Sequence, residues 1–207
     1  MYGEKCMRKF EPYLYSLIAI AVLAFYYFFA VQLHLRAGLL STANAVIAFS
    51  SLFILGFSFI LGPLAKFFIF FDKFLWYRKP FGLIGFGLAA LHTLLVVFIT
   101  VNSKTEVNLS DLSSLAFAGI AFMIFTLMAL TSTQKWMSSL GYENWKNLQR
   151  LGYLAILFVA FHVALLENGV FLTRITGQIA ISFILLILFL RALTIVLGLF
   201  SKKKIKV

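Results

Sequence analysis

The sequence predicts an all-α membrane protein, a bundle of six transmembrane helices with both termini in the cytoplasm. Two observations lead to this fold class. The 207 residues are 62% hydrophobic with a mean hydropathy of +0.99, whereas a soluble domain is about 45–50% apolar. The apolar residues also form six separate runs, each near the ~20 residues that a helix needs to cross a bilayer. The chain is therefore expected to lie in a lipid bilayer as one domain, 1–207.

The six runs are expected to form the helices in chain order. They lie at about 12–33, 45–71, 81–101, 114–132, 151–167 and 175–200. The first run is longer than the apolar part of a cleaved signal peptide, so we interpret it as a retained membrane helix. Gly62-Pro63 predicts a local kink in the second helix. Arg191 is expected to end the spanning part of the sixth helix at the inner interface.

Basic residues are unevenly divided between the two sides of the predicted bundle. Of the 18 Lys and Arg, only Arg36, Lys104 and Arg174 fall in the first, third and fifth connections, and fifteen lie on the other side. The positive-inside rule makes that other side cytoplasmic. The third and fifth helices then run outward in parallel. The net charge of +11 therefore reflects membrane topology, and no nucleic-acid partner is expected.

His92 and His162 are the strongest candidates for chemistry, because each lies in the middle of an apolar run, where an imidazole needs a partner. His92 follows Lys79 by thirteen residues and His162 follows Arg150 by twelve, or about 20 Å and 18 Å of helix. Since both basic residues mark the cytoplasmic face, the imidazoles are expected at nearly one depth. Two imidazoles at one depth suggest the axial ligands of a single b-type haem.

Other ligand sets and other uses of the histidines were weighed against haem. The lone Cys6 excludes an iron–sulfur cluster or a disulfide within one chain, and zinc usually takes three or four protein ligands. Small residues at Gly85, Ala89 and Ala155 leave room for a macrocycle or for another helix. The alternative is a small transporter or helix-bundle scaffold, in which the histidine pair relays protons or bonds to backbone carbonyls.

Several short motifs carry a resemblance to a known family. They are Arg78-Lys79-Pro80-Phe81-Gly82-Leu83, Leu91-His92, Leu130-Thr131-Ser132-Thr133-Gln134, Leu140-Gly141, Trp145-Lys146 and Leu151-Gly152-Tyr153-Leu154. In this order they resemble the ferric-reductase-like transmembrane domain family. With Gly62-Pro63-Leu64-Ala65-Lys66, the likeness is strongest to its MsrQ subfamily, the haem-binding membrane subunit of the periplasmic methionine sulfoxide reductase system. The resemblance covers about residues 60 to 165.

The resemblance implies a function and a set of partners. It implies haem b held by His92 and His162, with electrons passing across the inner (cytoplasmic) membrane from a flavin such as FMN, or from a quinone. The implied partners are a cytoplasmic flavin reductase and a periplasmic redox protein, such as a molybdenum-containing reductase. The subfamily often has a further histidine where this chain has Gln149, a poor iron ligand, so we expect one haem.

Weaker candidates lie at the two membrane faces. Five basic residues of the cytoplasmic side can attract an anionic flavin or haem propionates, although topology explains them equally well: Lys73, Arg78, Lys79, Lys146 and Arg150. His34, at the outer end of the first helix, is expected to be an interfacial polar residue. A third hypothesis is a quinol-linked enzyme with a site near His34 or Gln149. No dinucleotide-binding fingerprint occurs, so oxidation of NAD(P)H would require a separate protein or a diffusible flavin.

Overall fold

The computed structural model describes residues 13–14, 17, 20–21, 39–103 and 109–204. Within these ranges the chain is helical and contains no strand. Five segments are long and apolar enough to span a membrane: Leu40–Phe67, Ile69–Asn102, Leu112–Leu130, Tyr142–Thr173 and Ile175–Gly198. The expectation of an all-α, multi-pass membrane protein is confirmed. The first predicted helix, 12–33, lies almost entirely outside the described residues, so the count of six and the positions of the termini stay predictions.

Five spanning segments follow the order of the last five predicted runs, but the ends of the helices differ from those predicted. The first four described elements are α2 (Leu39–Phe67), η1 (Ile69–Tyr77), α3 (Arg78–Ser103) and α4 (Leu109–Leu130). The run predicted at 45–71 ends too late, because the apolar sequence continues past Phe67 while the backbone turns into the 3-10 helix η1. Hydropathy alone does not register such a change of helix type.

The second half of the chain contains two short helices that the hydropathy pattern did not predict. They are α5 (Gln134–Leu140) and α6 (Tyr142–Arg150), which precede α7 (Gly152–Leu165), η2 (Leu166–Thr173) and α8 (Ile175–Lys204). Gly141 separates the two short helices with a φ of 74°, a left-handed value that favours glycine. The helix α8 continues without a break through Arg191 to its end, and that Arg191 ends the membrane-spanning part of this helix stays a prediction.

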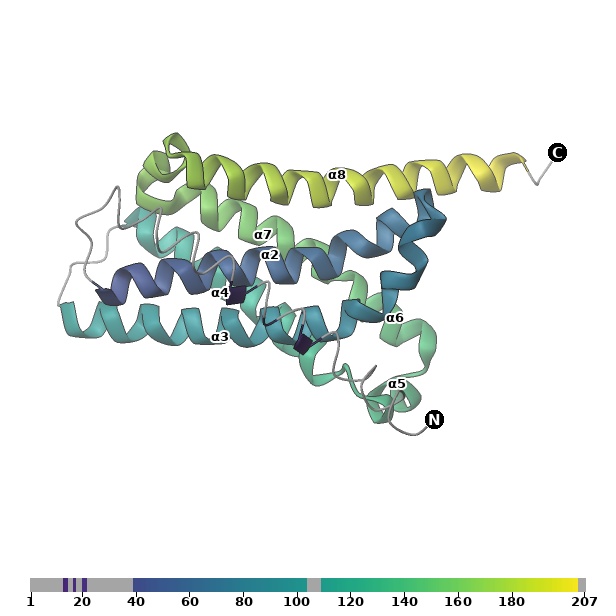
Figure 1. Cartoon of the computed structure of the whole chain (residues 1–207), viewed down its shortest axis with the longest axis horizontal. Coiled ribbons are helices and arrows are strands. Elements are labelled where there is room, and N and C mark those ends of the chain that lie inside the picture. The colour runs from purple at the N-terminus through teal and green to yellow at the C-terminus, as the bar shows by residue number, and fades with distance from the viewer. Residues whose placement is uncertain (1–12, 15–16, 18–19, 22–38, 104–108, 205–207) are drawn as a thin grey trace. The chain divides into compact units, whose positions relative to one another are not determined.

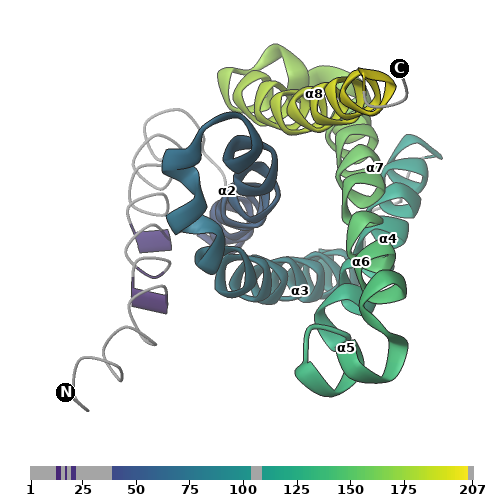
Figure 2. The same cartoon turned by 90° about the vertical axis from the view of Figure 1, so that its right-hand side faces the viewer.

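The chain divides into two compact units, and each is described by itself. Unit 1 comprises Met1–Ser58 and Tyr77–Val107, and unit 2 comprises Phe59–Trp76 and Asn108–Val207. In unit 1, α2 and α3 lie side by side and run antiparallel (Figure 1). In unit 2, α7 lies between α4 and α8 and contacts both (Figure 2). The expectation of one domain stays a prediction.

Hydrogen bonds at regular intervals fix the register of α2 against α3 in unit 1. They join Ser58 Oγ to Arg78 O at 2.7 Å, Ser51 Oγ to Gly85 O at 2.9 Å, and Asn44 Oδ1 to His92 Nδ1 at 2.8 Å. Successive contacts are seven residues apart on both helices, close to two full turns, so all of them lie on one face. We call this set of contacts the α2–α3 polar ladder.

Gly85 brings the two helices of unit 1 into close contact within that ladder. A Cβ atom at this position would lie 2.7 Å from the backbone nitrogen of Leu55 and 2.9 Å from its Cα. Real side chains do not tolerate such distances, and backbone atoms cannot rotate away. Small residues of this kind let membrane helices approach closely enough for side-chain hydroxyls to reach the neighbouring backbone.

In unit 2, aromatic and apolar side chains form the contacts around α7. The Phe59 ring lies 5.3 Å from the ring of Tyr153 and 6.1 Å from that of Phe125. Pro63 lies inside α2 and has no N–H to donate to the carbonyl of Phe59 four residues earlier. The Tyr153 hydroxyl donates to that carbonyl at 3.1 Å. A residue of α7 thus supplies the hydrogen bond that the proline removes.

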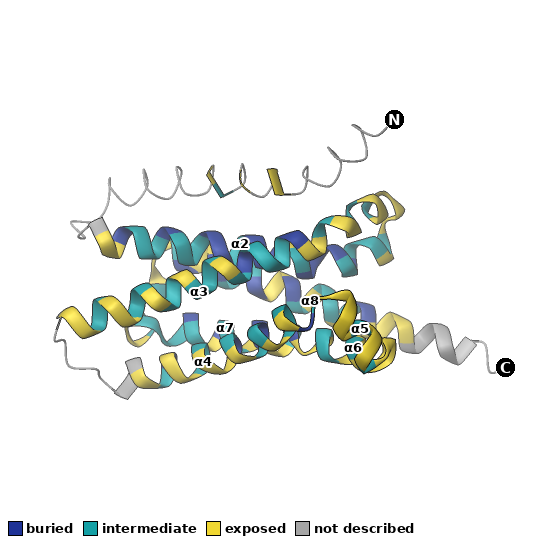
Figure 3. Cartoon of the chain, turned by 90° about the horizontal axis from the view of Figure 1, so that it is seen from below, coloured by how far each residue is buried: buried dark blue, intermediate teal, exposed yellow. Residues whose placement is uncertain are grey.

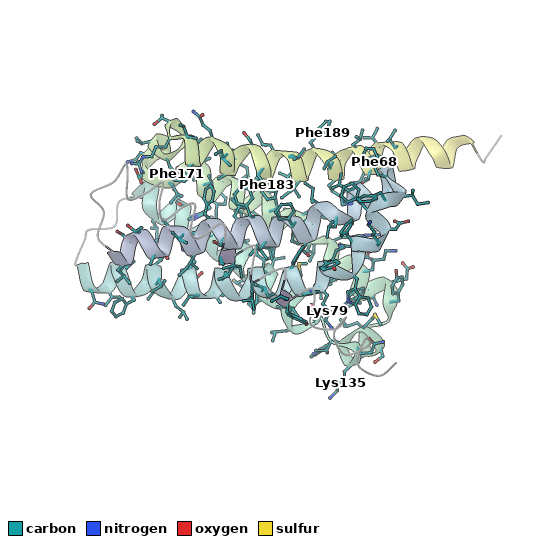
Figure 4. The ribbon with its side chains drawn as sticks, viewed as in Figure 1. Phe68, Lys79, Lys135, Phe171, Phe183 and Phe189 are labelled. Carbon is teal, nitrogen blue, oxygen red and sulfur yellow. The ribbon has the colours of Figure 1, made fainter. Side chains whose placement is uncertain are left out.

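Exposed apolar side chains recur along the spanning helices, as expected for surfaces in contact with lipid. Exposed residues are frequent along α3 and α4 (Figure 3). Phe189 extends outward from α8 and is 62% exposed (Figure 4). Lys135, on the short helix α5, also extends away from the ribbon (Figure 4). Exposed apolar side chains of this kind are compatible with a lipid environment, because lipid tails are as apolar as the side chains.

Candidate functional site

His92 lies on α3 in unit 1, and a side chain of α2 holds its imidazole. The Nδ1 atom lies 2.8 Å from the amide oxygen of Asn44, and the contact is partly buried. An amide oxygen only accepts hydrogen bonds, so Nδ1 carries the proton and donates it. The other ring nitrogen, Nε2, then has the lone pair that a metal requires of a neutral imidazole.

His162 lies on α7 in unit 2, and Ser114 of α4 holds its imidazole through two atoms. The Nδ1 atom lies 3.1 Å from the carbonyl oxygen of Ser114 and 2.9 Å from its hydroxyl oxygen. The same hydroxyl donates to the backbone carbonyl of His162 at 3.2 Å. Since the carbonyl oxygen of Ser114 only accepts, Nδ1 carries the proton here as well, and Nε2 has the lone pair.

The two histidines therefore have the same tautomer, and each is held from the preceding long helix. In both cases the partner lies 48 positions earlier in the chain. A histidine that binds a metal usually donates its second ring N–H to an oxygen acceptor, which fixes the ring and raises its basicity. Haem iron takes neutral imidazole nitrogens as axial ligands, so this donor set fits a haem. That the two rings share one iron stays a prediction.

Hydropathy analysis missed Asn44 and Ser114. Asn44 directly precedes the run predicted at 45–71, and Ser114 is the first residue of the run at 114–132. Each thus marks the boundary of a predicted run, and a polar side chain at the end of an apolar run carries little information about depth. The signal that was present is their shared spacing of 48 from the two central histidines.

Aromatic side chains lie near His162 within unit 2. The ring of Phe117, on α4, is 5.2 Å from that of Phe161 and 6.0 Å from that of Phe158, and both of these belong to α7. Phe158 is one helical turn before His162. The rings of Phe158 and Phe161 lie within about one turn of His162 along α7, and such aromatic side chains suit the face of a porphyrin as well as a lipid chain.

The predicted basic candidates mostly have structural partners within their own units. Arg78 Nε donates to the carbonyl of Ser58 at 3.1 Å, and Arg150 donates to Asn147 Oδ1 at 2.7 Å. Lys79 is exposed at the start of α3. The ammonium group of Lys73 lies 3.9 Å from the Phe70 ring centroid, and that of Lys146 lies 5.1 Å from the Tyr142 ring centroid. Their binding to a flavin or to propionates stays a prediction.

Gln149, which stands where the resembled subfamily often has a histidine, has a structural role in unit 2. Its side-chain amide donates to Met128 O at 3.3 Å, and Trp145 Nε1 donates to Thr131 O at 2.9 Å. Both acceptors lie at the carboxyl end of α4, where the last carbonyls of a helix have no partner within the helix. The helix α6 thus caps α4 through two side chains.

The remaining candidates are not brought into a site by the described residues. His34 lies outside them. In the ranges 39–103 and 109–204, together with the few described residues before them, no group of three or more His, Cys, Asp or Glu side chains comes together.

The spanning helices make the chain a multi-pass membrane protein. The model of the ferric reductase like transmembrane component family matches residues 37–160. This match covers more than half of the chain, so the protein belongs to that family. The matched range includes both His92 and Asn44, and it ends two residues before His162.

One relative with a known name is similar over part of the chain. The magnetosome protein MamZ of Magnetospirillum gryphiswaldense is 31% identical over 99 residues, which is 44% of this chain. The matched segment spans 15% of the length of MamZ. The similarity therefore concerns one part of a much longer protein.

Proposed function

We propose that this protein binds one b-type haem through His92 and His162 and passes electrons across the cytoplasmic membrane. In this proposal the donor is a flavin or a quinol on the cytoplasmic side, and the acceptor lies on the outer side. The membership in the ferric reductase like family supports the electron-transfer part of the proposal. The distribution of basic residues marks the cytoplasmic face, and the outward direction of transfer is what the resemblance to the family implies.

One observation carries the proposal: the Nδ1 atom of each imidazole lies within hydrogen-bond distance of an oxygen on a neighbouring helix, α2 for His92 and α4 for His162. The partners are Asn44 for His92 and Ser114 for His162. A histidine that only bridges two helices can use either tautomer. Both histidines have the tautomer that leaves Nε2 as the metal donor, and both have the second hydrogen bond typical of metal ligands.

In this proposal, the residues of the chain bind, orient and insulate the haem. His92 and His162 supply the axial nitrogens, while Asn44 and Ser114 hold the two rings in place. The rings of Phe117, Phe158 and Phe161 pack against one another between α4 and α7, and in this proposal they offer apolar contacts to the porphyrin. When bound, haem supplies one-electron redox chemistry at its iron. Gln149 caps α4 through Met128, which supports one haem rather than two.

Partners outside the membrane complete the proposed function. The chain has no dinucleotide-binding fingerprint, so we propose that a separate cytoplasmic flavin reductase, or the quinol pool, supplies the electrons. The resemblance to the subunit of the methionine sulfoxide reductase system supports a periplasmic redox acceptor. A molybdenum-containing reductase is the acceptor class that this resemblance favours.

A reduced-minus-oxidised absorption spectrum of the purified protein tests the proposal. The wild-type chain, expressed with sufficient haem and purified in detergent, should show a Soret band and the α band of a low-spin b-type haem. His92→Ala and His162→Ala should each lose most of the bound haem, whereas the control Gln149→Ala should retain it. Loss in one histidine variant with full retention in the other would contradict axial ligation by the pair. A wild-type protein without a Soret band would favour a transporter or a scaffold.

A further inference from the structure

The contacts of the two histidines differ in one respect that mutation can address. His92 donates to a side chain, the amide of Asn44, at 2.8 Å. His162 donates to the backbone carbonyl of Ser114 at 3.1 Å, with the Ser114 hydroxyl nearby at 2.9 Å. A substitution of Asn44 by an apolar residue removes the side-chain acceptor for Nδ1 altogether. A substitution at position 114 leaves the carbonyl in place.

We infer that Asn44 and Ser114 are positioning residues that set the orientation and basicity of the two imidazoles, and that Asn44 is the one whose side chain tunes the redox potential. The inference rests on the proposed function, because a redox potential exists only where a haem is bound. A stronger hydrogen-bond acceptor at Nδ1 gives the imidazole more anionic character. Such a ligand stabilises the ferric state more than the ferrous state and lowers the potential.

The α2–α3 polar ladder explains why Asn44 can act in this way. Ser58 and Ser51 bond to backbone carbonyls of α3 that lie about four and two turns from His92, at 2.7 and 2.9 Å respectively. These contacts fix the register of the two helices, so α2 cannot slide and carry the Asn44 amide out of reach. Asn44 is the member of the ladder whose partner is a side chain rather than the backbone. The α2–α3 polar ladder thus fixes the position of Asn44, and the amide oxygen of Asn44 accepts the hydrogen bond from the imidazole of His92.

Ser114 and His162 bond to each other reciprocally, and the position of the imidazole depends less on the side chain of Ser114 than that of His92 does on the side chain of Asn44. The hydroxyl donates to the carbonyl of His162 at 3.2 Å, while Nδ1 donates back to Ser114. Ser114 is 3% exposed, so water does not compete for these bonds. In Ser114→Ala the imidazole keeps the carbonyl as its acceptor, and its basicity changes less.

Redox titration of the haem-loaded, full-length protein tests this inference. Asn44→Leu removes the acceptor at similar size, and Asn44→Ser is a milder removal. Both should raise the midpoint potential, by about 59 mV for each tenfold change in relative affinity for the two iron states. Asn44→Asp retains an acceptor oxygen and should stay at or below the wild-type potential. Ser114→Ala should move the potential less than Asn44→Leu.

Thr93→Val is the matched control, because Thr93 lies beside His92 on α3 and bonds to the carbonyl of Ala89 at 2.9 Å rather than to the imidazole. It should have the wild-type potential. The low-spin electron paramagnetic resonance signal, which depends on ring orientation, should change in Asn44→Leu and not in Thr93→Val. If Asn44→Leu does not fold, Asn44→Ser and Asn44→Asp give the same comparison.

The failure of this inference differs from the failure of the proposed function. A wild-type protein with no haem would defeat the proposed function. A haem-loaded wild type whose potential and resonance signal are unchanged in Asn44→Ser would overturn only the positioning role. A rise in Asn44→Asp as large as that in Asn44→Leu would also overturn it, because the acceptor oxygen would then be irrelevant.

Discussion

The two units hold their central histidines with the same tautomer but are built by different forces. In unit 1, hydroxyl and amide groups of α2 bond to α3 at seven-residue intervals, and Gly85 meets the backbone of Leu55. In unit 2, the contacts around α7 are mainly aromatic and apolar, with Phe59, Phe125 and Tyr153 in one cluster. The hydrogen bonds of Ser114 to His162 are added to that packing.

The difference shows two ways in which helices associate in lipid. Burial of apolar side chains gives little net driving force there, since lipid tails are as apolar as the side chains. Unit 1 depends on polar bonds and on close backbone approach, both of which specify register. Unit 2 depends on the packing of complementary side chains. In it, the Tyr153 hydroxyl donates the hydrogen bond to Phe59 O that the backbone of Pro63 cannot donate. The stability of unit 1 should therefore be sensitive to small steric changes, and the stability of unit 2 to the loss of single hydrogen bonds.

The largest effect is expected for Gly85→Ala. The new Cβ would lie 2.7 Å from the Leu55 nitrogen, so α2 and α3 must move apart, at a cost of about 1–3 kcal/mol. Gly87→Ala on the same helix is the control, because nothing lies within 4 Å of its Cβ position. It should be neutral or stabilising by up to ~1 kcal/mol. Unfolding by sodium dodecyl sulfate in mixed micelles measures both. Equal stability of the two variants would mean that close approach does not hold unit 1 together.

The next effect concerns unit 2 and the carbonyl that Pro63 leaves without its helical donor. Tyr153→Phe removes the hydroxyl that bonds to Phe59 O at 3.1 Å but keeps the ring, over which Arg191 lies at 4.8 Å. Leaving a buried carbonyl without this donor costs about 1–3 kcal/mol. In the Pro63→Ala background the backbone N–H returns, so the same substitution should cost much less. If a double-mutant cycle of Tyr153→Phe and Pro63→Ala shows no coupling energy, the Tyr153 hydroxyl does not replace the hydrogen bond that Pro63 removes.

Much of the fold could be predicted from the sequence, because hydropathy and charge are local properties. Five of the six predicted runs correspond to spanning segments among the described residues. The two short helices α5 and α6 could not be predicted in this way. Their sequences are polar and short, and α6 is placed by bonds from Trp145 and Gln149 to the end of α4. Those bonds depend on tertiary structure rather than on periodicity.

The candidate site was predicted only in part. His92 and His162 stand out, because an ionisable residue in an apolar run is rare. Asn44 and Ser114 do not, since each lies at the edge of its run and becomes informative only when the helices pair. The role of Arg78 was also hidden, because its Nε donates to Ser58 O on the neighbouring helix. Contacts between helices decide these roles, and no single segment contains them.

A smaller effect is expected for the middle contact of the α2–α3 polar ladder. Ser51→Ala removes the hydroxyl that donates to Gly85 O at 2.9 Å. Hydrogen bonds between membrane helices average about 0.6 kcal/mol and reach about 1.7 kcal/mol, so the loss should lie in that range. Thr126→Val is the control, because Thr126 bonds to the carbonyl of Phe122 within its own helix. If both variants lose equal stability, the ladder contributes no more than any hydroxyl in a helix.

The smallest effect is expected at the turn after α7 in unit 2. Arg174 bonds to both carboxylate oxygens of Glu167, at 2.6 and 3.1 Å, but the two side chains are 42% and 51% exposed. Exposed pairs contribute about 0–1 kcal/mol and are weakened by salt. Glu167→Gln should therefore cost less than Tyr153→Phe, and its cost should shrink in high salt.

Glu167 also has a φ of 52°, which glycine adopts without strain, so Glu167→Gly should recover part of what the lost ion pair costs. If Glu167→Gln lowers the stability strongly and independently of salt, this turn stabilises unit 2 as strongly as its aromatic cluster does. Unit 2 would then depend on a charged contact as well as on aromatic packing.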